Sequence, residues 1–106
     1  MRRFALGRDS NGRELPVVEQ SDYLCAIVFA GPGSQSIPIP SGATFAAFAS
    51  TGAYWVRVGG LAAVPSSDVL DGTAAELNPP SRALGGATVL GVAVPLACTV
   101  SVAFYG

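Results

Sequence analysis

Apolar and polar residues alternate with a period of two near the end of the chain. From 98 to 105 (CTVSVAFY), Cys, Val, Val and Phe occupy the even positions, and Thr, Ser, Ala and Tyr the odd ones. This period is typical of a strand that lays one face on a core. It predicts a strand over residues 97–105.

A second pattern spans residues 37–60 (IPIPSGATFAAFASTGAYWVRVGG). Residues 44–50 and 53–58 predict two strands that are separated by Thr51-Gly52, a tight-turn signal, and Gly59-Gly60 ends the second strand. Pro38 and Pro40 can lie only at a strand start or at a sheet edge, because proline cannot donate to a ladder. The pattern predicts a β-hairpin around which the rest of the chain is arranged.

The remaining runs also predict strands. They lie at 22–30, 35–39, 61–65, 81–84 and 88–94, with glycine or proline at the joints. Residues 66–78 form a long connection, in which Ser67-Asp68 can cap a brief helical turn. We therefore expect an all-β fold, an antiparallel β-sandwich or jelly roll of seven or eight short strands, with under about a tenth of residues in helix.

The first hairpin strand is apolar or small on both faces. Phe45 lies on one face with two alanines, and Phe48 lies on the other. A strand that is apolar on both sides is buried on both. Since a small sandwich covers one face only, we expect the other, with Phe48, to be buried between copies of the chain.

Charge is concentrated at the start of the chain. Eight of the thirteen charged residues fall within the first 22 positions, which predicts a polar, extended N-terminal arm at 1–21 and a sandwich domain at 22–106. Residues 9–12 (DSNG) carry a turn signal within this arm. All six basic residues are arginine, which suits interfacial ion pairs better than lysine does. The candidate interface residues are Arg2, Arg3, Arg8, Arg13, Phe48 and Arg57.

Charged residues make up only 12% of the chain, and the net charge is −1. A chain of 106 residues with so little charge is expected to bury part of its surface against other subunits. The near-zero charge gives no electrostatic footprint for nucleic acid. The first apolar run is broken at Gly7-Arg8, so we expect no signal peptide and assembly in the cytoplasm.

The two cysteines and the C-terminal stretch each have two interpretations. Cys25 and Cys98 match no metal or redox spacing and lie in apolar runs, so we expect them to be reduced and buried rather than disulfide-bonded. Residues 83–106 carry no charge and are long enough to cross a bilayer. Glycines and a proline interrupt them, so paired strands are the better interpretation, and no membrane partner is expected.

No constellation of residues predicts catalysis. The chain has no histidine to serve as a base for a nucleophile, and its glycine pairs lack the spacing of a phosphate loop. The acidic residues Asp68, Asp71 and Glu76 do not fit a calcium loop. We expect them to make turn hydrogen bonds and a salt link to Arg82 or to a neighbouring subunit. We expect no enzyme, cofactor or metal.

Three segments carry a resemblance to a known class of protein. The segments IPIPSGATF, YWVRVGGLAAVPSSDVLDGTAAELNPPSRAL and the terminal AFYG resemble small virion structural proteins of tailed bacteriophages, over residues 35–106. The resemblance implies a β-rich head decoration or cement protein in the virion, bound to the major capsid protein. It transfers no catalytic or ligand-binding residue. A homo-oligomer is expected, with a trimer favoured because it suits the three-fold positions of a capsid lattice.

Two other functions remain open from the sequence. One is a tail or baseplate adaptor, which is also structural. The other is a carbohydrate-binding module that stacks sugars on Tyr54 and Trp55. Exposure of Trp55 in a shallow groove would favour sugar binding, and burial would favour a structural protein.

Overall fold

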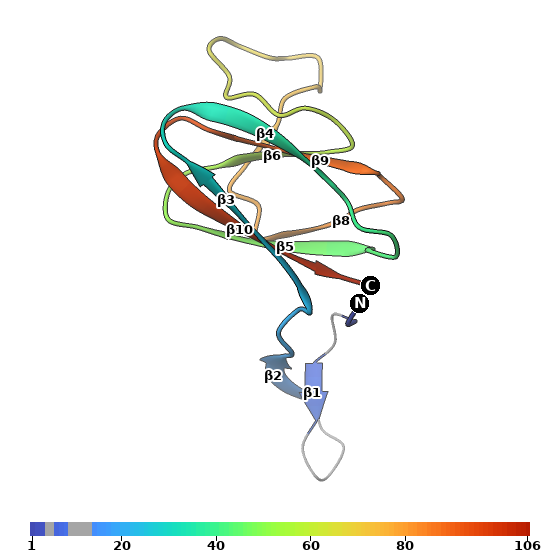
Figure 1. Cartoon of the computed structure of the whole chain (residues 1–106). Helices are drawn as coiled ribbons and strands as arrows, with labels where there is room; N and C mark the ends of the chain where they lie inside the picture. The colour runs from blue at the N-terminus through green and yellow to red at the C-terminus, as the bar shows by residue number, and fades with distance from the viewer. Residues whose placement is uncertain (4–5, 9–13) are drawn as a thin grey trace.

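The computed structural model describes the backbone of residues 1–3, 6–8 and 14–106, with side chains for 1–3 and 19–106. No described residue is helical, and the strands are antiparallel throughout. Figure 1 shows two stacked sheets and a separate small hairpin. The expectation of an all-β sandwich is confirmed.

Each layer of the sandwich is a four-stranded sheet. Sheet I contains, in spatial order, β3 (Tyr23–Phe29), β10 (Cys98–Tyr105), β5 (Phe45–Ser50) and β8 (Ser81–Ala83). Sheet II contains β4 (Gly33–Pro38), β9 (Val89–Val94), β6 (Trp55–Val58) and β7 (Glu76–Leu77). The alternation at 98–105 therefore belongs to a central strand, β10, which pairs with β3 on one side and β5 on the other.

The core lies between the two sheets. Val100, Val102 and Phe104 of β10 are fully buried and face the buried residues Leu90, Val92 and Val94 of β9. Each fully buried valine, leucine or phenylalanine contributes about 1.5–3 kcal/mol relative to exposure. This facing pair of central strands thus carries a large share of the folding free energy.

The strands of the predicted hairpin exist, but they do not pair with each other. β5 lies in sheet I and β6 in sheet II. The rings of Phe48 and Tyr54 meet between the sheets, with centroids 6.1 Å apart. At the exposed turn Thr51-Gly52 the chain therefore passes from sheet I to sheet II instead of reversing within one sheet, and both aromatic side chains are buried between the sheets. The strand limits were predicted to within two residues, whereas the hairpin pairing was wrong.

The chain passes over the outside of sheet II between β6 and β7. Residues 59–75, which we call the covering loop, contain neither strand nor helix, so the short strand predicted at 61–65 and the helical turn at Ser67-Asp68 do not form. Figure 1 shows the loop above β4, β6 and β9. The long connection predicted at 66–78 is confirmed except for the two-residue strand β7.

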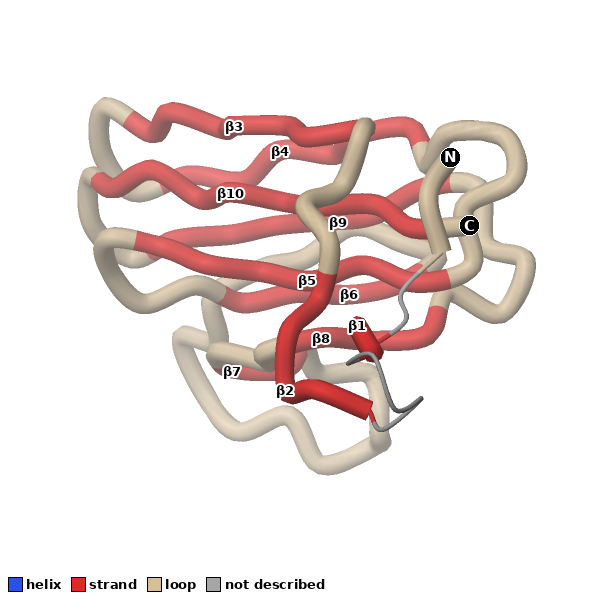
Figure 2. The backbone as a smooth tube through the Cα atoms, turned by 90° about the horizontal axis from the view of Figure 1, so that it is seen from below, coloured by secondary structure: helices blue, strands red, loops and turns tan. Residues whose placement is uncertain are grey.

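The N-terminal strands form a hairpin of their own. β1 (Leu6–Arg8) pairs with β2 (Glu14–Val18) and with neither sheet of the sandwich. Figures 1 and 2 place this hairpin on the outer side of sheet I. The turn predicted at 9–12 lies outside the described residues. The division into an arm at 1–21 and a domain at 22–106 stays a prediction.

Both cysteines are free thiols, and both are half-buried rather than buried. Cys98 lies opposite Phe29 in the ladder between β10 and β3, four residues along the strand from Cys25. Four residues of strand span about 13 Å, beyond the roughly 7 Å between Cα atoms that a disulfide can bridge. The expectation of two unpaired thiols is confirmed, and the expectation of full burial is wrong.

The uncharged C-terminal stretch contains β9 and β10, which lie in different sheets and are each paired with two neighbouring strands. Over the described part of the chain, no helix is long and apolar enough to cross a membrane.

Candidate functional site

The covering loop lies directly on the outer face of sheet II. A Cβ at Gly91, in the middle of β9, would lie 2.4 Å from the carbonyl oxygen of Gly60 and 2.5 Å from the amide nitrogen of Ala62. Ala62 of the loop and Ala93 of β9 are both almost fully buried. Because only a hydrogen at Gly91 leaves room for the loop backbone, the glycine allows the loop to lie on the sheet.

Arg57 ties the covering loop to β6. Its Nη1 donates a hydrogen bond to the carbonyl oxygen of Thr73. Thr73 is held in turn by Asp71, whose carboxylate accepts from the Thr73 hydroxyl at 2.6 Å and from its amide at 3.1 Å. The hydroxyl bond, followed by the amide bond, lowers the pKa of Asp71 below its ordinary 3.8. The turn hydrogen bond expected of Asp71 is confirmed, and a role for Arg57 at an interface stays a prediction.

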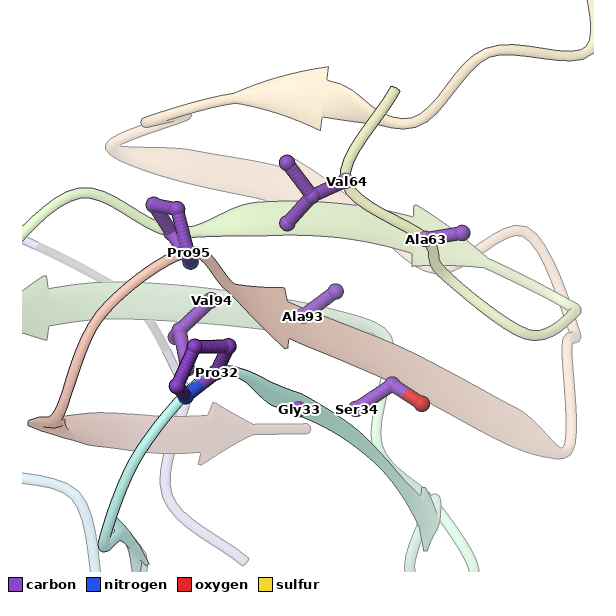
Figure 3. A pocket seen from close by; sticks show the side chains of 8 residues that line it. All are labelled: Pro32, Gly33, Ser34, Ala63, Val64, Ala93, Val94 and Pro95. Carbon is purple, nitrogen blue, oxygen red and sulfur yellow. The ribbon is translucent and has the colours of Figure 1, made fainter. Parts of the chain in front are cut away.

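A shallow groove of about 520 Å³ opens between the covering loop and sheet II. Figure 3 shows the residues that line it, which come from 32–34, from 63–64 of the loop and from 93–95. Apart from the Ser34 hydroxyl, the lining side chains are apolar. The groove can hold an extended apolar segment. It offers no acid, base or activated nucleophile among the described residues that line it.

An ion pair closes the edge of the sandwich formed by β7 and β8. Arg82 lies opposite Ala46 and Glu76 lies opposite Val56, so both side chains point toward the space between the sheets. Arg82 donates from Nε to Oε1 of Glu76 at 2.7 Å and from Nη2 to Oε2. The hydrogen bond from Arg82 lowers the pKa of Glu76 below its ordinary 4.5. The sequence analysis expected a salt link from the acidic residues to Arg82 or to a neighbouring subunit, and the link to Arg82 is confirmed.

The turn between β7 and β8 is held by Tyr54. The Tyr54 hydroxyl donates to the carbonyl oxygen of Pro79 at 2.6 Å, and the Tyr54 amide donates to the side-chain oxygen of Asn78 at 2.9 Å. Burial raises the pKa of the Tyr54 hydroxyl above its ordinary 10.0. Since Tyr54 is buried and Trp55 is half-buried outside the described groove, the two do not form a sugar-stacking platform.

The opposite edge, formed by β3 and β4, carries no charge, because no residue between Asp22 and Arg57 is charged. The outward side chains of β3 are exposed, with Leu24 at 50% and Val28 at 77%. Its inward side chains, Cys25, Ile27 and Phe29, are only partly buried. This edge is therefore apolar and partly open to solvent.

The start of the chain, at Arg2, lies against the sandwich beside the C-terminus. The amide of Gly106 donates to the carbonyl oxygen of Arg2 at 2.7 Å. Arg2 donates from its amide to Asp22 Oδ1 at 3.0 Å and from Nη1 to the carbonyl oxygen of Gln20 at 3.1 Å. The first of these bonds lowers the pKa of Asp22 below its ordinary 3.8. Arg2 is thus engaged within its own chain.

The remaining candidate interface residues have different outcomes. Phe48 is 9% exposed and lies in the core, so its expected place on a surface between copies is wrong. The alternation had the correct period, but it did not identify which face of β5 meets the other sheet. Arg3 is exposed. Only the backbone of Arg8 is described, and Arg13 lies outside the described residues.

Two features missed by the sequence analysis are the groove and the open edge at β3. Neither is built from charged or catalytic residue types, so only the absence of charge after Asp22 signalled them. No group of three or more His, Cys, Asp or Glu side chains that could hold a metal ion lies within the described part of the chain. No protein-family model, curated protein or solved structure matches this chain.

Proposed function

We propose that the chain is a non-enzymatic decoration protein that binds the major capsid protein of a tailed bacteriophage and stabilises its head. The observation that carries the proposal is the separation of charge from apolar surface. Charge is concentrated in the first 22 residues, while β3 and its edge present exposed apolar side chains without a single charge. Exposed apolar surface of this kind marks sites of protein association.

We also propose that the sandwich is a jelly roll. Its support is the strand order, β3-β10-β5-β8 facing β4-β9-β6-β7. Along the chain from β3 to β10, every connection passes from one sheet to the other except the one between β6 and β7. Double-sheet jelly rolls occur in viral capsid and lectin domains. Because one fold serves many functions, this topology is compatible with the proposal but does not identify the partner.

The N-terminal arm is proposed to make the contact with the shell. The hairpin of β1 and β2 pairs with neither sheet, which leaves it available to a neighbouring protein. Arginines at positions 3, 8 and 13 would supply charge-assisted hydrogen bonds to capsid carboxylates. A hydrogen bond to a charged group contributes about 1.5–3 kcal/mol. Self-association belongs to the same proposal, and its expected trimeric state stays a prediction.

Deletion of residues 2–20 tests the arm. The deletion keeps Ser21, whose hydroxyl bridges the start of β3 and the carbonyl oxygen of Phe104. We therefore expect the truncated protein to keep the β-sheet circular dichroism of the full chain. Much less of the truncated protein than of the full chain should co-sediment with capsids that lack this protein. A variant with Arg3, Arg8 and Arg13 replaced by Ala separates the arginine contacts from the presence of the hairpin.

The outcomes distinguish the parts of the proposal. Truncated protein that binds capsids as fully as the full chain would refute the role of the arm. Full-length protein that binds no capsid would refute the decoration function itself. Specific binding to isolated tails instead would favour the adaptor function.

A further inference from the structure

Three of the four edge strands of the sandwich carry features that discourage pairing with another chain, and β3 carries none. β7 and β8 have two and three residues, and their ion pair lies at that edge. β4 begins with Gly33, ends with Pro38 and is mostly polar between them. Short length, charge and proline are the usual protections of a sheet edge. β3 has seven residues and contains no charge, proline or glycine.

The side chains of β3 are also left partly uncovered on both of its faces. Leu24, Ala26 and Val28 are exposed on the outer side of sheet I. Ile27 and Phe29 point inward, yet they are only half-buried, since the sandwich is not closed at this edge. An edge with unpaired backbone groups and apolar side chains on both sides favours the addition of a further strand.

We propose that β3 pairs with β3 of a second copy of this chain, antiparallel and about a two-fold axis. β3 runs from Tyr23 to Phe29, so its central residue is Ala26. A two-fold axis through Ala26 sets that residue opposite itself and sets Leu24 opposite Val28 of the other copy. The two most exposed apolar side chains of the strand then cover each other, and only a methyl group stands at the axis.

The second copy is favoured as occupant because this edge offers no charge for a dissimilar partner to match. A two-fold contact needs a self-complementary surface, and a strand without charge is self-complementary in the antiparallel register. Pairing would join the two copies of sheet I into one continuous sheet of eight strands. The inference rests on the self-association in the proposed function, with a two-fold dimer in place of the trimer expected from the sequence, and it does not rest on the capsid.

The size of the edge sets the strength of the contact. Seven residues of strand span about 23 Å, and the two layers of the sandwich lie about 10 Å apart. With the outward side chains included, this edge supplies on the order of 500 Å² per copy, below the roughly 800 Å² of a standard interface. We therefore expect a reversible dimer that is weaker than one with a standard-size interface.

Substitution of Ala26 by Glu tests the pairing. It sets two carboxylates directly opposite each other at the axis, where like charges are destabilising. Ala49→Glu is the matched control, because Ala49 is exposed on the same face of sheet I but lies on β5, which is paired on both sides. In sedimentation velocity without capsids, we expect Ala26→Glu to weaken the dimer at least about tenfold. We expect Ala49→Glu to leave it unchanged.

A second variant tests the register directly. Residues opposite each other in an antiparallel pair lie about 4.5–5.5 Å apart at Cα, which is within the reach of a disulfide. Ala26→Cys is therefore expected to give a covalent dimer on oxidation. Ala49→Cys and the wild-type chain are expected to give none.

The inference is overturned by a wild-type chain that stays monomeric at high micromolar concentration. A trimeric mass that Ala26→Glu leaves intact also overturns it, as does dissociation by Ala49→Glu alone. Capsid binding by a monomeric Ala26→Glu variant would leave the decoration function standing, so the two proposals fail separately.

Discussion

Replacement of Gly91 by Ala tests whether the covering loop is part of the fold. The new Cβ would lie 2.4 Å from the carbonyl oxygen of Gly60, 2.5 Å from the amide nitrogen of Ala62 and 3.0 Å from the carbonyl carbon of Leu61. Favourable contacts between such atoms lie near 3.5 Å. All three neighbours are backbone atoms, so the loop has to move away from the sheet by about 1 Å.

The cost follows from two contributions. Overpacking of a tightly packed site costs about 1–3 kcal/mol. Lifting the loop also re-exposes the Ala62 methyl group, which is now 4% exposed, at about 0.8 kcal/mol. The sum is about 2–4 kcal/mol, which corresponds to a fall in Tm of roughly 8–20 °C for a domain of this size.

Urea unfolding followed by Trp55 fluorescence and circular dichroism measures this change. Gly31→Ala is the matched control, because a Cβ at Gly31 would meet no heavy atom within 4 Å. That control should be neutral or up to about 1 kcal/mol more stable, through a less flexible unfolded chain. A Gly91→Ala protein within about 0.5 kcal/mol of wild type would show that the loop does not pack on β9 as described.

Three further predictions concern the core, the ion pair between Glu76 and Arg82, and the two thiols. Phe48→Asp should fail to fold in circular dichroism, because it places an unpaired charge between the sheets; a folded monomer would contradict the core assignment. The lowered pKa of Glu76 stabilises the fold above about pH 4.5, and this stabilisation is lost as pH falls through the folded-state pKa. In acid melts Glu76→Gln should therefore lose less stability than wild type; equal losses in the two proteins would argue against the ion pair. Both Cys25 and Cys98 should react with a thiol reagent in denatured, unreduced protein, and two unreactive thiols would mean a disulfide.

The strands could be predicted from local pattern, because a period of two is visible wherever one face of a strand is buried. β10 is the clearest case: its even positions lie in the core as their alternation predicts. The limits of β5 and β6 were predicted from the turn residues between them. Which strand each one pairs with was not predicted, because a short turn can reverse the chain within a sheet or carry it across to the other sheet.

The candidate surfaces were harder to predict. Phe45 and Phe48 lie on opposite faces of β5, and nothing local distinguishes the face that meets sheet II. The contact of Gly91 with Gly60 and Ala62 joins segments about thirty residues apart, so it leaves no periodic signal. By contrast, the link between Glu76 and Arg82 was predicted, since few charges in the body of the chain can pair with each other.

The proposal that this chain decorates a phage head is tested most directly by mass spectrometry of purified virus particles. A decoration protein is predicted to be present in a whole-number ratio to the major capsid protein, and to remain with heads when tails are removed. Absence of the chain from purified particles would contradict the claim, as would a few copies that leave with the tails.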